Sequence, residues 1–459
     1  MSGFNDPRFP PELDSSIISY LADDPASLRN CSLVCHALLT ASRQFKFEEV
    51  TLKYQDDVVR LREVLLASPE LGQHVRSVKI SPPAQYVTRP KTLAFKMPEF
   101  RSDLITTHVR SHPRGKVALY SVGPEMSRKS TQLLLDVVPS FKSAVKLSLS
   151  ACHISGHDLA AIISTMDRLE EVALLQCEVI PVTELFTHLD SSFWIGPYRQ
   201  MYSWSHQDGP NTESTSATTS TSPVIRRLVV SPSLPIVGTR LLGSDAVLDY
   251  LIAGNLWHNV QSLVLIIPDK PTLRAAERLI RELAHSVLKL HLAFNFNQGA
   301  FDEIRLEETG SWLNQIAKTI SKENRLQELI LVDVSTSPRL RWLTVIEILR
   351  HLSCSSLEHL HVEPSRETDD DDEEPFAFHA GYHGILAEIL GATNVSPTSE
   401  YGSRGDFRVR EPENWKLPGL KRVDFVYYGQ CVDEWKGFMA ETYFGLERRG
   451  VLGLVAANA

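Results

Sequence analysis

One apolar pattern returns along most of this 459-residue chain and limits the folds that it can adopt. The pattern places apolar residues at the first, fourth and sixth positions of a six-residue stretch. Side chains two positions apart point to the same side of a β-strand, so each match predicts a strand with one buried face. The nine matches are Val75-Val78-Ile80, Ala144-Leu147-Leu149, Leu169-Val172-Leu174, Ile225-Leu228-Val230, Val260-Leu263-Leu265, Val287-Leu290-Leu292, Leu326-Leu329-Leu331, Leu357-Leu360-Val362 and Leu420-Val423-Phe425.

Segments with apolar residues at a period near 3.6 lie between these strands and predict helices. A strand followed by a helix, repeated, gives a parallel sheet lined by helices, and the units must stack because one unit cannot bury its own apolar side. Three steps between matches, 75 to 144, 169 to 225 and 357 to 420, are too long for one unit, so the repeat is irregular. The predicted helices span residues 57–66, 157–166, 244–252, 271–284, 311–320 and 340–352.

The pattern resembles the strand segment of leucine-rich repeats, written L-x-x-L-x-L. The resemblance implies an α/β fold in which residues 53–459 form an irregular leucine-rich-repeat-like solenoid, with a parallel sheet on the concave face and helices outside. Most units lack the asparagine or cysteine that normally follows such a strand. Cys152 and Cys177 lie near that position in two units.

The N-terminal segment predicts a group of short helices. Pro11 suits a first helical turn, and Asp24 followed by Pro25 suits an N-cap and the first position of a second helix. Apolar residues then recur at helical spacing through residue 38. About forty residues cannot bury a sufficient core alone, so their apolar surface must rest on a partner or on the following domain.

Residues 9–50, FPPELDSSIISYLADDPASLRNCSLVCHALLTASRQFKFEEV, resemble an F-box of the fungal type. Phe9 stands where that family usually has leucine. Leu38 and Leu39 stand where a tryptophan commonly follows the Val-Cys pair, here Val34 and Cys35. The resemblance implies that residues 1–52 dock onto the Skp-type adaptor of a cullin–RING ubiquitin ligase, and that the rest of the chain recognises a target protein for degradation. The residues expected to contact the adaptor are Pro10, Leu13, Ile17, Ile18, Leu21, Leu28, Val34, Cys35 and Leu38.

Two other functions stay open. The chain could be a scaffold protein without ligase function, whose degenerate F-box only caps the solenoid. Exposure of the apolar face, or its burial against residues 50–80, separates that reading from a receptor. The chain could also be an enzyme with a site spread over loops.

The composition limits partners and cofactors. The net charge is −9, and the sequence has no basic cluster that predicts nucleic-acid binding. We expect no membrane span, because no window reaches eighteen apolar residues. Six cysteines without zinc spacing and the lack of a signal peptide predict a reduced protein of the cytoplasm or nucleus.

No catalytic motif is present, so the sequence predicts neither an enzyme nor a cofactor. His359 and His361 face the same side of a predicted strand, and with the nearby His351 they could bind a metal. Histidines on such a variable face are more often surface or contact residues, so we expect no metal site. His153 and His157 carry the same weak signal.

Two segments interrupt the repeats and predict flexible insertions. Residues 208–223 are rich in Ser and Thr, and residues 363–375 contain the six adjacent carboxylates from Asp369 to Glu374. We expect the first to be disordered or a mobile loop and the second to be a solvated loop, with contact to a basic partner or phosphorylation as the alternative for the acidic run.

The variable strand positions should form the target-binding face, because they point away from the core. They mix charges with apolar residues, as a surface for a protein partner does. The expected residues are Lys79, Lys146, Glu171, Arg227, Lys289, His291, Glu328, His359, His361, Arg422 and Asp424.

Overall fold

The computed structural model describes fourteen segments of the chain, and these fall into two compact units. Among the described residues, the first unit holds those up to Arg226 and the second holds those from Arg227 onward. Each unit is an α/β structure. The described segments are residues 11–22, 24–53, 55–80, 134–150, 153–180, 223–232, 246–253, 257–268, 270–294, 306–333, 338–364, 375–391, 417–427 and 432–456.

All nine predicted strands are present, and each begins two residues after the first apolar residue of its match. The first unit contains β2 (Ser77–Ile80), β3 (Lys146–Ser150) and β5 (Glu171–Ile180). The second contains β6 (Arg227–Pro232), β7 (Ser262–Ile267), β8 (Lys289–Phe294), β9 (Glu328–Asp333), β10 (His359–Pro364) and β11 (Arg422–Tyr427).

The strands pair in parallel, and their register aligns the same pattern position from strand to strand. In the first unit Val78, Leu147 and Val172 form one row. In the second unit the row runs through Leu228, Leu263, Leu290, Leu329, Leu360 and Val423. These side chains are buried, so each row forms part of a core. Burying one large apolar side chain contributes roughly 1.5–3 kcal/mol.

Helices connect the strands, and all six predicted helices are confirmed. The first unit has α1 (Pro11–Ser19), α2 (Pro25–Cys31), α3 (His36–Lys46), α4 (Gln55–Ala67), α6 (Gly156–Ser164) and the 3-10 turns η1 (Pro69–His74) and η2 (Val138–Ser140). The second has α9 (Ala246–Ala253), α10 (Lys270–Leu283), α11 (Leu306–Glu323), α12 (Pro338–His351), α13 (Pro375–Ile389), α14 (Val432–Thr442) and α15 (Phe444–Arg448).

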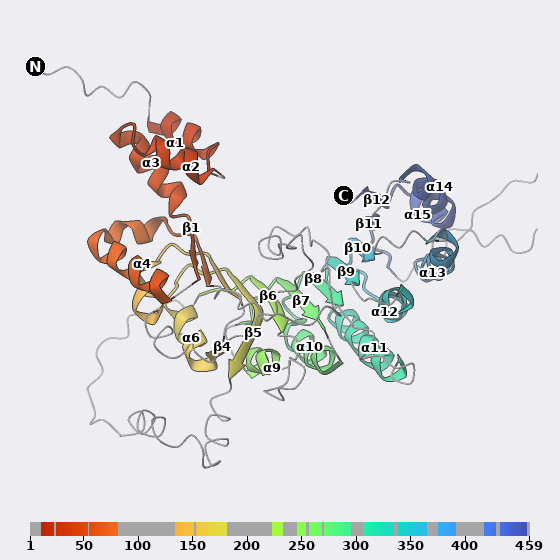
Figure 1. Ribbon diagram of the computed structural model, residues 1–459. Coiled ribbons are helices and arrows are strands. Elements are labelled where there is room, and N and C mark those ends of the chain that lie inside the picture. Colours follow the sequence, from red (N-terminus) through yellow and green to blue (C-terminus); the bar gives the residue numbers. More distant parts are fainter. Residues whose placement is uncertain are drawn as a thin grey trace, which may run out of the picture. The chain divides into compact units, whose positions relative to one another are not determined.

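In the second unit the helices α9 to α12 follow one another along one face of the strands (Figure 1). Each packs on the next in sequence order, and α9, α10 and α12 also contact the strands beneath them. Helix residues such as Leu279, Ile316 and Leu349 are buried. The opposite face of the same strands carries the variable positions.

Turns that precede neighbouring strands are tied together by side chains. Asn324, at the end of α11, has a positive φ of 49°, a conformation that Asn adopts more readily than most residues. Its Oδ1 accepts hydrogen bonds from the backbone N–H groups of Ser355 (2.7 Å) and Ser356 (3.2 Å). Gly419, before β11, approaches the carbonyl of Ser355 so closely that a Cβ would lie 2.1 Å from the oxygen. Ser355 therefore joins the turns before three successive strands.

Cys177 makes a comparable tie in the first unit. Its buried Sγ donates to the carbonyl oxygen of Leu149, at 3.2 Å, in the neighbouring strand β3. Cys177 was expected near the turn after the strand, but it lies within β5, which continues to Ile180, and its side chain bonds the backbone of the preceding repeat. Cys152 lies outside the described residues.

Three strands are additional to the predicted ones: β1 (Glu49–Leu52), β4 (His153–Ser155) and β12 (Leu452–Ala456). β1 pairs with β2 in parallel, so the end of the expected helical segment 1–52 belongs to the sheet. β4 pairs with β5, and β12 pairs with β11. The first insertion lies outside the described residues except for Pro223. Of the second, only Glu363, Pro364 and Pro375 are described.

Candidate functional site

The helical segment at the N-terminus, α1 to α3, begins its second helix with the predicted cap. Oδ1 of Asp24 accepts hydrogen bonds from the backbone N–H groups of Ala26 (3.0 Å) and Ser27 (3.1 Å). Oδ2 accepts from the Ser27 hydroxyl (2.6 Å), and these bonds lower the pKa of the Asp24 carboxyl. The cap fixes where α2 starts, and Pro25 occupies its first position.

The three helices enclose a small core of their own. Ile18, Leu28 and Ala41 are buried in it, and Leu21 and Leu38 pack against them. Ile18 and Leu28 therefore cannot offer their side chains to an adaptor, contrary to the expectation from sequence. Helical spacing marked them as apolar but could not tell an inward face from an outward one.

Other apolar side chains of the segment face solvent. Leu13 and Ile17 lie on α1, and Val34 lies in the turn before α3, where it is 72% exposed. Cys35, at the N-cap of α3, is an exposed free thiol. Pro10 lies outside the described residues.

Two further exposed apolar residues are absent from the adaptor-binding set expected from the sequence. Tyr20 follows Leu13 and Ile17 at helical spacing, and Leu33 precedes Val34 with 79% of its surface exposed. The spacing 13, 17, 20 was a readable signal for an outer face that α1 and the turn directly after it share. We call Leu13, Ile17, Tyr20, Leu33 and Val34 the exposed apolar set. Soluble proteins rarely expose large apolar side chains in groups unless they bind something.

On the strand face of the first unit, the expected target-binding residues pair with carboxylates or with each other. Lys79 Nζ lies 2.8 Å from Glu49 Oε1 of β1, a residue absent from the expected set. Lys146 Nζ lies 3.2 Å from Glu171 Oε1 across β3 and β5. Their charges are thus neutralised within the unit.

The second unit holds the other eight expected residues on the strand face of β6 and β8 to β11. The structure pairs Lys289 with Glu328 (2.6 Å) and Arg422 with Asp424 (2.8 Å). His361 Nε2 lies 3.6 Å from Glu363, which the sequence interpretation did not include, and His359 is exposed. Arg227 completes the group at its β6 end.

His291 lies in the middle of this face and is the titratable group most affected by it. Burial lowers the pKa of His291 to about 4, and nearby His361 and Arg227 act in the same direction. Glu363 and Glu328 oppose them. The imidazole is therefore neutral at pH 7.

Some positions expected to point outward are buried instead. They include Ser148 and Ala173 in the first unit and Val229 and Val264 in the second. Ile330 likewise packs against a separate buried cluster of Ile266, Ala293 and Val332.

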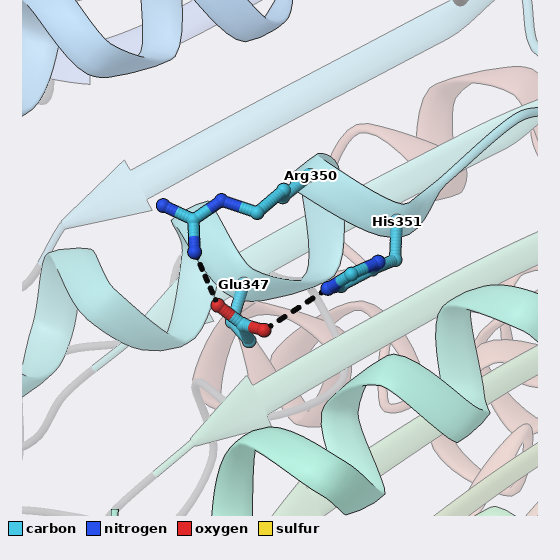
Figure 2. Close-up of polar contacts among 3 residues, drawn as sticks. All are labelled: Glu347, Arg350 and His351. Carbon is cyan, nitrogen blue, oxygen red and sulfur yellow. Dashed lines mark hydrogen bonds and ion pairs between the residues drawn. The ribbon is translucent and has the colours of Figure 1, made fainter. Parts of the chain in front are cut away.

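His351 is separate from the histidines with which the sequence grouped it. It lies on α12, where its Nε2 is 3.1 Å from Glu347 Oε1, while Arg350 donates to Oε2 of the same carboxylate at 3.0 Å (Figure 2). Arg350 and Glu347 form an i,i+3 ion pair on one helix, and His351 contacts the same carboxylate from position i+4. Within the described segments, no three His, Cys, Asp or Glu residues are placed to hold a metal ion.

No protein-family model matches this chain, and a search of curated proteins found no significant match. In the part of the chain that the structure describes, no helix has the length and apolar character needed to cross a bilayer.

Proposed function

We propose that this chain is an F-box protein that serves as the substrate receptor of a cullin–RING ubiquitin ligase. The helical segment α1 to α3 would bind a Skp-type adaptor, and the strand–helix repeats, a leucine-rich-repeat-like solenoid, would bind the target. Ubiquitin transfer would belong to other subunits, and this chain would contribute proximity.

The observation that carries the proposal is the exposed apolar set on a segment that already has a closed core. Ile18, Leu28 and Ala41 satisfy the packing of the three helices, so Ile17 and Val34 are not needed inside. An apolar contact of this kind contributes roughly 1.5–3 kcal/mol per large side chain when a partner covers it. A docking surface accounts for both the closed core of the three helices and the apolar side chains left exposed outside it.

The alternative is a scaffold protein in which the helical segment only caps the repeats. α3 does contact η1, as a cap would require. A cap, however, would bury its apolar face against residues 50–80, whereas the exposed apolar set faces solvent. We therefore favour the receptor.

Reconstitution tests this choice. Full-length protein is mixed with purified Skp-type adaptor and cullin and passed over a size-exclusion column. The receptor should elute in one complex that contains the cullin only when the adaptor is present. Elution of this chain alone, with the adaptor and cullin still bound to each other, would reject the receptor in favour of the cap.

A further inference from the structure

Charged side chains on the strand face of the second unit differ in how far they reach into solvent. The side chains of Lys289 and Arg422 are 61% and 60% exposed, whereas their partners Glu328 and Asp424 are 26% and 16% exposed. Glu363, beside His361, is also mostly covered. The cationic groups therefore form the outer layer, and the carboxylates lie beneath them.

The cationic groups of this outer layer can donate hydrogen bonds but cannot accept them. An ammonium group has three N–H donors and a guanidinium group has five, and neither can accept. The ion pairs with Glu328 and Asp424 engage only part of the donors of Lys289 and Arg422. The Nε of Arg227 is buried and has no hydrogen-bond partner among the described residues. The donors that the ion pairs of Lys289 and Arg422 leave free can donate to a partner.

Register places these groups in one line across the strands. Neighbouring strands lie about 4.8 Å apart, so five steps from β6 to β11 span about 24 Å. An extended peptide of about seven residues has this length. The line contains Arg227, Ser262, Lys289, Glu328, His359 and Arg422.

We propose that this line of the second unit binds an extended acidic segment of the target protein, whose carboxylates accept from Arg227, Lys289 and Arg422. The proposal rests on the receptor function, because it names the chemistry of the target that the receptor would take. Charge complementarity selects the partner: the outer groups Lys289 and Arg422 are cationic and mostly exposed, whereas the carboxylates of this face are mostly covered, so carboxylates of a partner would meet cations first. The exposed ion pairs already present are weak, so a partner can share their cations.

The test is a titration of the full chain, without adaptor, by fluorescence anisotropy at low ionic strength. The probes are labelled peptides of about ten residues. One alternates Glu with Ser, and the others carry Gln or Lys in place of Glu. The Glu peptide should bind about tenfold more tightly than the Gln peptide, and added salt should weaken the binding of the Glu peptide.

Two triple variants with the same change in charge locate the site. Replacement of Arg227, Lys289 and Arg422 by Gln should weaken the Glu peptide about tenfold. Replacement of Arg278, Lys318 and Lys322 by Gln, on the helices α10 and α11, should leave its affinity unchanged. Because Asp369 to Glu374 carry carboxylates of their own, the titration is repeated with these residues changed to Asn and Gln.

Equal binding of the Glu and Gln peptides would overturn the proposal, and so would tighter binding of the Lys peptide. Equal losses in the two triple variants would also overturn it, because the attraction would then be a non-specific effect of net charge. The adaptor takes no part in this titration. Failure here and failure of the ligase complex are therefore separate results.

Discussion

Neighbouring residues along one strand meet opposite surroundings in this protein. On β10, Leu360 lies in the buried row that joins six strands of the second unit, β6 to β11, while the preceding His359 faces solvent. The alternation follows from the two-residue period of a strand, so the apolar pattern assigns the faces residue by residue.

A pair of substitutions tests this assignment. Leu360→Asp places a carboxylate in the core and should lower the free energy of unfolding by more than about 4 kcal/mol. His359→Asp should change it by less than about 0.5 kcal/mol. Urea denaturation measures both. Similar losses from the two variants would mean that the face of the strand is assigned wrongly.

His291 gives the strand face a pH dependence. Its pKa is about 4 in the folded protein, whereas that of a histidine in an unfolded chain is about 6.5. Between these values the unfolded chain binds more protons, so stability falls as the pH falls from 6.5 to 4. The loss reaches on the order of 3 kcal/mol at most.

The variant His291→Gln should therefore lose less stability than the wild type between pH 7 and pH 4.5, as measured by urea denaturation at each pH. His359→Gln, at an exposed position of the same face, serves as the control and should follow the wild type. A wild-type curve parallel to that of His291→Gln would show that His291 titrates as an ordinary exposed histidine.

At the scale of elements, the sequence predicted the repeated strands and helices well because each repeat must bury the same apolar positions. β1 also carries the apolar pattern, as Phe47, Val50 and Leu52. It was not predicted as a strand because those residues were assigned to the F-box-like helical segment. β12 was not predictable, since Arg449 stands at its first pattern position. α13 was not predicted because its own apolar residues lie on all sides of the helix and show little helical periodicity.

The candidate sites were less predictable than the fold. Periodicity named Ile17 and Ile18 together, and only packing on α3 decided that Ile18 turns inward. Likewise, the sequence marked Lys79 and Lys146 as charges on a strand face. It could not show that Glu49 and Glu171 engage them, because those pairs depend on register between strands that lie far apart in the chain.

The turns between elements carry a prediction of their own at Asn324. Asn324→Gly keeps the positive φ but removes the hydrogen bonds to Ser355 and Ser356, so it should cost about 1–2 kcal/mol. Asn324→Asp keeps the accepting oxygen and should cost less. Thermal unfolding of both variants measures the difference. Equal melting temperatures would show that the side-chain oxygen of Asn324 does not stabilise these turns.

For the whole molecule, the proposed function assigns adaptor docking to the N-terminal helical segment and target binding to the strand face of the second unit. The two tasks involve different residues, so substitutions in one should leave the other intact. The triple variant of the strand face should thus still bind the adaptor. In the proposed receptor, adaptor binding should in turn depend on the exposed apolar set and not on the strand face.

Calorimetric titration of the full chain with purified Skp-type adaptor tests this claim most directly. The wild type should bind saturably in a one-to-one ratio, and the double variant Ile17→Asp, Val34→Asp should bind at least about 100-fold more weakly, since two large apolar contacts are lost. The control Gln44→Asp, at an exposed position of α3, should bind like the wild type. A wild type that gives no binding, or a double variant that binds as tightly as Gln44→Asp, would contradict the account.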